Sequence, residues 1–390
     1  MKAIINANII APDLTGKFTV KENGCILFDD KIQDIFFGKP LQSHSEMEGF
    51  QIIDAKNRFV SPGFINIHMH GVLGADTMDE TDDALSVMAK GEASMGVTGF
   101  LPTTMTYDIP RIHRALERVR KAANEKIGAK VLGAHMEGPF ISMEKRGAQG
   151  ADFIKRADFH DIEEFTDVIK IITLAVEETN EEFFTKAREN GILLSLGHSV
   201  ADYETAKNAI TEGKIQHITH LYNGMAPFHH RTPGIVGAAF DSNVKVELIA
   251  DNVHSHPMAQ RLAYNVKGIE NIILITDSMR ASCMGDGLSE LGGQEVTVKG
   301  NLATLKNGAI AGSVVKMNKE IKIFADNTGA PIERVIETVT KNPALSLGIY
   351  DKTGSIEVGK RADLTIFDEE LEIFATVVEG EIVFNSDLAM

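Results

Sequence analysis

The chain has 390 residues, of which 43% are hydrophobic and 24% are charged, and its formal net charge is −16 at pH 7. This length and composition are typical of a globular protein with one large domain and a smaller one. The acidic balance argues against non-specific binding to nucleic acid or to anionic membranes, so an anionic substrate would need a local basic cluster.

Cysteine content and the N-terminal segment indicate the cellular compartment. The chain contains two cysteines, Cys25 and Cys283, so we expect no disulfide framework, and a reducing cytosol fits. Residues 1–6 lack the layout of a signal peptide, and no apolar run approaches the length of a membrane span. We therefore expect a cytoplasmic protein.

Both ends of the chain have the pattern of short strands separated by turn residues. Apolar or alternating runs occupy residues 3–10, 24–28 and 31–36 near the N-terminus, and 355–358, 364–367 and 375–384 in the tail. We predict that residues 1–57 and 354–390 fold together as a small β-sandwich domain.

The middle of the chain, residues 58–353, alternates between strand-like and helix-like segments. The strand-like runs are residues 64–67, 99–102, 131–136, 170–176, 192–196, 215–220, 246–250 and 271–276. The helix-like segments are residues 109–124, 179–190, 202–212 and 257–266. This alternation predicts an α/β fold, a (β/α)8 TIM-like barrel.

Two further features complete the predicted barrel. Residues 221–240 are interrupted by Gly and Pro, which predicts a loop with at most short helices. After the eighth strand we expect a β-hairpin insertion, with strands at residues 294–298 and 302–305, and then two more helices.

The first predicted barrel strand ends in two histidines one residue apart, His68 and His70. Residues i and i+2 of a strand project from the same face, so the two imidazoles would point the same way. Neutral imidazoles that converge on one spot are common ligands of zinc and related metals. The pair alone is also compatible with a structural role, so the other strand ends decide the interpretation.

The chemistry of a (β/α)8 barrel lies at the C-terminal ends of its strands. Six predicted strands end in or near a histidine or a carboxylate: His68, His70, His135, Glu137, His198, His220, Asp251, His254 and Asp277. One such residue is usually structural, but a coincidence across six strand ends predicts an active site.

These residue types indicate metal-assisted hydrolysis. Glu and His side chains on neighbouring strands form a ligand set for Zn²⁺ or Fe²⁺ that leaves one position open for water, whose pKa a bound metal lowers to roughly 7. Asp277 is positioned to take a proton from that water and pass it to a leaving group. The set suits hydrolysis of an amide or a related bond and needs no Ser or Cys nucleophile.

Several motifs resemble the amidohydrolase superfamily. They are His68-x-His70 after Ser-Pro-Gly-Phe, the strand-end His198 and His220, Asp277, and the tail GSIEVGKRADL at residues 354–364. Within the superfamily, GAHMEGPF (133–140), GHS (197–199), THLYNGM (219–225) and IADNVH (249–254) resemble the members that deacetylate N-acetyl-D-glucosamine 6-phosphate.

This resemblance spans nearly the whole chain and carries specific expectations. It implies a cytoplasmic homodimeric enzyme of amino-sugar catabolism and cell-wall recycling that releases acetate and D-glucosamine 6-phosphate. It also implies one or two divalent ions per chain, Zn²⁺ or Fe²⁺. By the same resemblance, the principal metal ligands are Glu137, His198 and His220, the second-metal pair is His68 and His70, and the catalytic acid/base is Asp277.

The resemblance also assigns substrate-binding residues. Asn223 and Gly224 correspond to sugar- and phosphate-contacting residues, and Arg231 and His254 to a phosphate-binding pair in which Arg231 reaches in from the neighbouring subunit. A guanidinium suits phosphate because it offers paired N–H donors. Gln149 stands where some members carry a substrate-contacting histidine; it can donate a hydrogen bond but cannot act as an acid.

Three further interpretations are weighed beside these assignments. His229 and His230, next to Arg231, either help to bind phosphate or are surface residues. A cyclic amidase of the dihydroorotase type would carry a metal-bridging lysine at the end of strand 4, but that strand is followed by Glu177 and Glu178. A barrel that had become a non-enzymatic binding protein would have lost metal ligands, and none of the expected ligands is missing.

Overall fold

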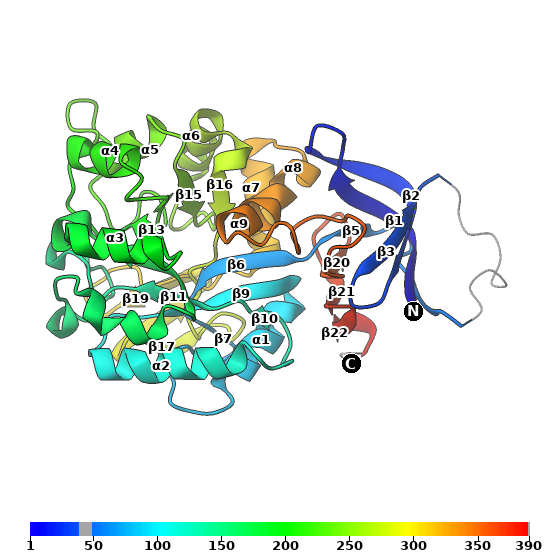
Figure 1. Ribbon diagram of the computed structural model, residues 1–390, viewed down its shortest axis with the longest axis horizontal. Coiled ribbons are helices and arrows are strands. Elements are labelled where there is room, and N and C mark those ends of the chain that lie inside the picture. The colour runs from blue at the N-terminus through cyan, green and yellow to red at the C-terminus, as the bar shows by residue number, and fades with distance from the viewer. Residues whose placement is uncertain (39–48, 389–390) are drawn as a thin grey trace.

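The computed structural model describes residues 1–38 and 49–388, and these form a barrel of parallel strands beside a separate sheet (Figure 1). The barrel occupies one end of the molecule, and both chain termini lie at the other end, by the separate sheet. The prediction of a (β/α)8 barrel with an additional sheet domain is confirmed. The exact domain boundaries stay a prediction, and residues 39–48 and 389–390 of the predicted terminal domain lie outside the described residues.

The barrel strands are parallel and follow one another around the sheet. Strand β9 pairs with β6 and with both β10 and β11, and from β11 each strand pairs with the next as far as β16. Their bounds are β6 (Phe64–Met69), β9 (Val97–Thr104), β10 (Lys130–Val131), β11 (Ala134–Glu137), β12 (Ile169–Leu174), β13 (Leu193–Leu196), β14 (His217–Ile218), β15 (Lys245–Leu248) and β16 (Ile272–Leu274).

The two ends of this parallel series meet at the C-terminal end of the strands. The Asp277 N–H, just after β16, donates to the His68 carbonyl oxygen of β6 at 2.9 Å. The N–H groups of His70 and Gly71 both donate to the Ser278 carbonyl oxygen, at 2.8 and 2.9 Å. The barrel therefore closes at the place where the predicted site residues lie.

Helices pack around these strands. They are α1 (Ala84–Ser94), α2 (Ile109–Ala122), α3 (Glu181–Glu189), α4 (Tyr203–Thr211), α5 (Gly234–Phe240), α6 (Pro257–Lys267), α7 (Met317–Thr328), α8 (Ile332–Ile336) and α9 (Lys341–Ser346). Three predicted helices begin at side-chain N-caps, because Asp108, Asn180 and Asp202 each accept a hydrogen bond from a backbone N–H three residues later. No helix in the described ranges combines the length and the apolar character needed to cross a membrane.

The separate sheet combines both ends of the chain, in the order β22-β21-β20-β5-β1-β2-β3, with β4 paired to β1. Its strands are β1 (Lys2–Pro12), β2 (Phe18–Phe28), β3 (Ile32–Phe36), β4 (Gln51–Asp54), β5 (Phe59–Pro62), β20 (Leu364–Phe367), β21 (Ile373–Val378) and β22 (Glu381–Asn385). It is joined to the barrel by buried hydrogen bonds from Thr365 Oγ1 to Gly96 O (2.6 Å) and from Thr376 Oγ1 to Ala93 O (2.7 Å).

Four elements differ from the sequence-based expectation. Helix α1 was not predicted, because it is buried on several sides and lacks a clear polar face. The hairpin insertion has a third strand, β17 (Gly287–Leu291), beside β18 (Gln294–Lys299) and β19 (Leu302–Leu305). In the described chain three helices, not two, follow it. The predicted strand at residues 355–358 is wrong, because Gly354 and Gly359, with φ of 91° and 90°, turn the backbone on both sides.

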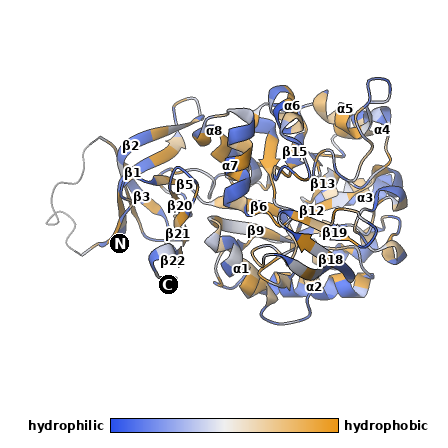
Figure 2. Ribbon diagram, turned by 180° about the vertical axis from the view of Figure 1, so that it is seen from behind, coloured by the Kyte–Doolittle hydropathy of each residue, from blue (hydrophilic) through white to orange (hydrophobic). Residues whose placement is uncertain are grey.

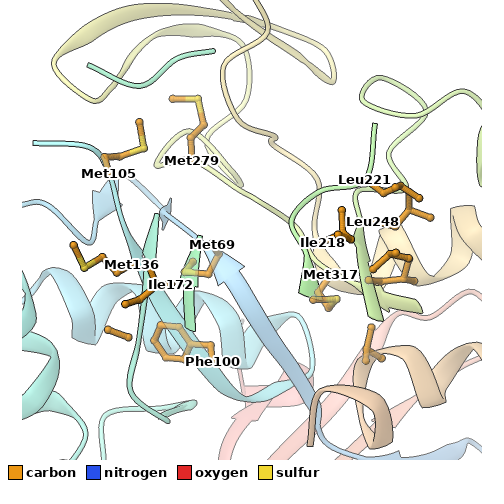
Figure 3. Close-up of a cluster of buried hydrophobic side chains, with 14 of the residues drawn as sticks. Met69, Phe100, Met105, Met136, Ile172, Ile218, Leu221, Leu248, Met279 and Met317 are labelled. Carbon is orange, nitrogen blue, oxygen red and sulfur yellow. The ribbon is translucent and has the colours of Figure 1, made fainter. Parts of the chain in front are cut away.

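The apolar core surrounds the barrel strands. Figure 3 shows Met69, Phe100, Met136 and Ile172 gathered at one place, and Ile218, Leu221, Leu248 and Met317 at another, and all eight side chains are buried. In Figure 2 hydrophobic colour follows the central strands, whereas helices such as α2 alternate in colour. This is the pattern expected of parallel strands covered by helices.

We predict that Glu92 makes stability depend on pH. This α1 carboxyl is fully buried, and its Oε2 accepts a hydrogen bond from Asn66 Nδ2 at 3.0 Å. Burial raises its pKa to about 7. Because the unfolded chain releases this proton at lower pH, stability is full below about pH 4.5 and falls by about 1.4 kcal/mol per pH unit until about pH 7. Glu92→Gln should remove this loss.

Thermal unfolding of the wild type and of Glu92→Gln at pH 5 and pH 8 checks this expectation. The Tm of the variant relative to the wild type should rise between the two pH values. A difference in Tm that stays constant with pH would show that Glu92 does not titrate in the folded protein as described.

Candidate active site

A buried carboxylate, Glu137 at the end of β11, lies at the centre of the predicted site. Its Oε1 is 3.1 Å from the Nε2 atoms of both His198 and His220 and 3.5 Å from that of His68. Its Oε2 is 3.1 Å from His70 Nε2. Four histidines at the C-terminal ends of β6, β13 and β14 therefore direct the same ring nitrogen toward one carboxylate.

The other ring nitrogen of each histidine is held by the surrounding structure. Nδ1 of His70, His198 and His220 lies 3.1, 2.7 and 3.1 Å from the backbone carbonyl oxygens of Thr103, Lys145 and Asn223. A carbonyl oxygen can only accept, so each Nδ1 is the donor, and Nε2 is the nitrogen that can bind a metal ion once its proton is released. His68 Nδ1 lies 3.0 Å from Glu247 Oε2, with the same consequence. Such outer contacts are typical of metal-binding histidines.

Three of the strand-end residues have left-handed backbone conformations. The φ angles are 49° at His198, 30° at His220 and 45° at Asp277. Non-glycine residues rarely adopt this region, and it costs of order 1–3 kcal/mol at each position. Each of these residues directs its side chain toward Glu137 or the cavity. Backbone strain of this kind is commonly retained at functional sites.

The donor atoms fit divalent metal ions. Of three groups of potential ligands among the described residues, two border the cavity, Glu137 with His198 and His220, and His68 with His70 and Asp277. The third is His68 with His135 and Glu247, and within each group the ligand atoms lie within 4.8 Å of one another. Ligand atoms about 2.0–2.1 Å from a tetrahedral zinc are about 3.3 Å apart. The His198 and His220 Nε2 atoms are 3.1 Å apart. His70 Nε2 is 3.2 Å from Asp277 Oδ1, and the buried His68 Nε2 has no hydrogen-bond partner among the described residues.

The electrostatics of the centre favour ionised carboxylates. Burial by itself would raise the pKa of Asp277, but the charges of His68 and His70 outweigh it and lower that pKa to about 2. Burial likewise opposes ionisation of Glu137, and the neighbouring His68 and His198 hold its pKa well below the usual range. Both acids are therefore available at neutral pH as ligands or proton acceptors.

A cavity opens onto this centre and brings most of the predicted substrate-binding residues together. Its lining includes His70, Glu137, Gln149, His198, His220, Asn223, Gly224, His254 and Asp277. Gly224 lies against the ligand rings: a Cβ there would be 3.1 Å from His198 Nδ1 and 3.2 Å from His220 Cε1. The residues predicted for the site other than His68 and Arg231 therefore line one cavity, and their roles stay predictions.

His254 and Gln149 are both fixed by partners in this cavity. His254 Nδ1 lies 2.7 Å from Asp251 Oδ2; burial alone would lower the pKa of His254, but Asp251 outweighs burial and raises it. Gln149 Nε2 donates to Glu137 Oε2 at 2.6 Å, and its Oε1 accepts from the Thr106 N–H at 2.7 Å. An imidazole whose pKa is raised, and which therefore holds a positive charge more readily, and a cavity-lining amide are groups that suit an anionic, hydroxyl-rich ligand.

Arg231 does not reach this cavity within one chain. It lies on the exposed loop before α5 and lines a different surface depression, with Tyr203 and Pro233. Its Nη1 is 2.8 Å from His230 Nε2, and His229 and His230 are likewise exposed. A contribution of Arg231 to the site would therefore have to come from another copy of the chain.

Sequence reasoning missed two groups of site residues. Glu247, within β15, holds His68; a single carboxylate inside the apolar run Val246–Ala250 was the available signal. Met105, Leu291 and Ile310 form an apolar wall of the cavity. Leu291 belongs to β17 and Ile310 follows β19, so this wall depends on how the insertion folds back, for which the sequence gives no local signal.

The chain was compared with known families and proteins. The model of the Amidohydrolase family matches residues 59–383. A protein of Bacillus subtilis (strain 168) named N-acetylglucosamine-6-phosphate deacetylase is 40% identical over 378 residues, covering 94% of both chains. The mouse protein of the same name is 35% identical over 353 residues, 86% of both chains.

Solved structures of enzymes with that name have the same fold. The one from Thermotoga maritima shares 34% identity with a TM-score of 0.87, covering 98% of this chain and 100% of that one. The one from Pasteurella multocida shares 30% identity with a TM-score of 0.90, covering 98% and 99%.

We predict that Glu137→Gln removes most metal binding. The substitution keeps the shape of the side chain but replaces the negative charge on which four imidazoles converge, so tight binding of a divalent ion should be lost. Metal content after dialysis, measured by elemental analysis, checks this. Glu337→Gln is the matched control, because Glu337 is also buried but bonds the Phe18 N–H instead. Equal metal content in Glu137→Gln and the wild type would contradict the assignment.

Proposed function

The chain belongs to the amidohydrolase family, and we propose that it hydrolyses N-acetyl-D-glucosamine 6-phosphate to D-glucosamine 6-phosphate and acetate. The observation that carries the proposal is the convergence of four histidine Nε2 atoms and Asp277 around Glu137 at the base of one cavity. A relative of the named activity, 40% identical over 94% of both chains, supports the choice of substrate. Release of acetate from that sugar phosphate by the purified protein, with and without the 6-phosphate, tests it.

We assign the metal ligands from the two groups of donor atoms. Glu137, His198 and His220 would hold the principal ion, and His68 and His70, with Asp277, a second one. Histidine and carboxylate donors fit Zn²⁺ or Fe²⁺. When bound, such an ion supplies a Lewis acid for the amide carbonyl and an activated water.

Asp277 is proposed as the acid/base. It borders the cavity, and the low pKa given by His68 and His70 keeps it ionised at neutral pH. It therefore accepts a proton from the attacking water. Once protonated, the same carboxyl donates to the amine nitrogen as the amide bond breaks, so one residue serves both halves of the reaction.

The sugar phosphate would be held by the remaining cavity residues. His254, with its raised pKa, attracts the phosphate against the net charge of −16, and Asn223, Gly224 and Gln149 contact the sugar. Because Arg231 lies away from the cavity of its own chain, we propose a cytoplasmic homodimer in which each Arg231 completes the partner's phosphate site.

We predict that Asp277→Asn lowers turnover by orders of magnitude while the substrate and the principal metal ion remain bound. Asparagine preserves the shape of the residue but cannot accept the proton, so kcat should fall about 10²–10⁴-fold. Acetate release, together with substrate affinity and metal content, separates loss of chemistry from loss of binding. Near-normal kcat in this variant would remove Asp277 from the acid/base role.

Arg231→Ala should weaken recognition of the phosphate. A buried charge-assisted contact contributes about 1.5–3 kcal/mol, so kcat/KM for the phosphorylated sugar should fall roughly 10- to 150-fold. The unphosphorylated sugar should be much less affected, and equal losses on both substrates would exclude a phosphate contact.

Mixed dimers test whether Arg231 acts across the subunit boundary. Arg231→Ala and Asp277→Asn subunits, co-expressed, should form hybrids in which one site has both an intact Asp277 and the partner's intact Arg231. Activity above that of either variant alone is expected. No gain in a verified hybrid would place Arg231 and Asp277 in the same subunit's site.

A further inference from the structure

We infer that Glu247 is a positioning residue that holds His68 toward the second ion subsite, and this inference rests on the proposed metal-dependent function. Glu247 lies in β15, and its Oε2 is 3.0 Å from His68 Nδ1. Both side chains are fully buried. A carboxylate can only accept here, so Nδ1 is the donor, and Nε2 is the nitrogen that faces Glu137 Oε1 and Asp277 Oδ1, at 3.5 and 3.6 Å, and is available to a metal ion.

His68 differs from the other three central histidines in how it is oriented. His70, His198 and His220 are held by backbone carbonyl oxygens, which any sequence provides. His68 is held by a charged side chain from a strand on a different part of the barrel. The orientation of His68 therefore depends on the identity of residue 247, and a hydrogen bond to a carboxylate also makes the ring a stronger electron donor.

The surroundings of Glu247 argue that it is more than a stabilising ion pair. It lies in register with the buried Ile273 of β16, and a ring nitrogen of the buried His135 lies within 4.8 Å of its carboxylate. Its Oε1 has no hydrogen-bond partner in the described structure. Burying a carboxylate in such surroundings is costly, and an apolar replacement often matches or exceeds the stability of a buried ion pair. Orientation of a metal ligand gives this carboxylate a role that an apolar side chain cannot fill.

The test compares stepwise binding of Zn²⁺ to metal-free wild type, Glu247→Leu and Glu247→Gln, by calorimetry and elemental analysis. The wild type should bind two ions per chain. Glu247→Leu should lose the weaker ion or bind it about 10- to 100-fold less tightly, while the tighter ion is retained. Glu247→Gln should bind the weaker ion with an affinity between those of the wild type and Glu247→Leu, because the glutamine carbonyl oxygen still accepts from His68 Nδ1 but carries no charge. If Glu247→Leu does not fold, the result for Glu247→Gln decides the test.

Glu320→Gln provides a matched control. Glu320 in α7 is also fully buried, with one oxygen 2.6 Å from the Ala250 N–H and the other without a partner among the described residues, but it bonds no histidine. The Glu320→Gln variant should bind two Zn²⁺ ions with the affinities of the wild type. Two ions of wild-type affinity in both Glu247 variants, or a single ion in the wild type, would overturn the inference.

Acetate release by the wild type, measured in parallel, separates the two proposals. If the wild type deacetylates the sugar phosphate and the Glu247 variants bind both ions unchanged, only the proposed role of Glu247 is refuted. If the wild type binds two ions but releases no acetate, and the Glu247 variants lose one ion, only the proposed function is refuted.

Discussion

The buried carboxylate of Glu137 is the constraint on which the arrangement of the site depends. An isolated carboxylate at 2% exposure would be strongly destabilised, so compensating charge has to lie within reach. The structure supplies it from the ends of β6, β13 and β14, as the Nε2 atoms of His68, His70, His198 and His220. A bound divalent ion would neutralise the buried negative charge more completely, because it binds the carboxylate and the neutral imidazoles together.

Fold and site are linked because the barrel closes where the chemistry lies. Asp277 donates its N–H to the His68 carbonyl oxygen, so the backbone bond that joins β16 to β6 also fixes the distance between an acid and a ligand. The left-handed conformations at His198, His220 and Asp277 add local strain at the same end of the barrel. The buried apolar contacts of the barrel strands help to offset the free-energy cost of this strain.

The elements added to the barrel shape the cavity without supplying its reactive groups. The three-stranded insertion contributes Leu291, and Ile310 follows it, so one wall beside the carboxylates is apolar. Gln294 Nε2 of this insertion donates to the Ala148 carbonyl oxygen at 2.6 Å, next to Gln149. The position of Gln149, and through it that of Glu137, is therefore connected to the way the insertion docks.

The sequence by itself determined the architecture and which histidines and carboxylates stand at the strand ends. Parallel strands buried on both faces leave an apolar run at each strand, and functional residues follow these runs directly, so the barrel and residues such as Glu137, His198 and Asp277 could be predicted from local pattern. Helix α1 could not, since burial on several sides removes the periodic signal. Strand β17 could not, since it is short and largely exposed and so has no apolar run. Only the tertiary structure decided which nitrogen of each histidine faces the centre, that Glu247 holds His68, and that Arg231 lies outside its own cavity. Those facts depend on contacts between residues far apart in the chain, such as the 179 positions between His68 and Glu247, and no local pattern encodes them.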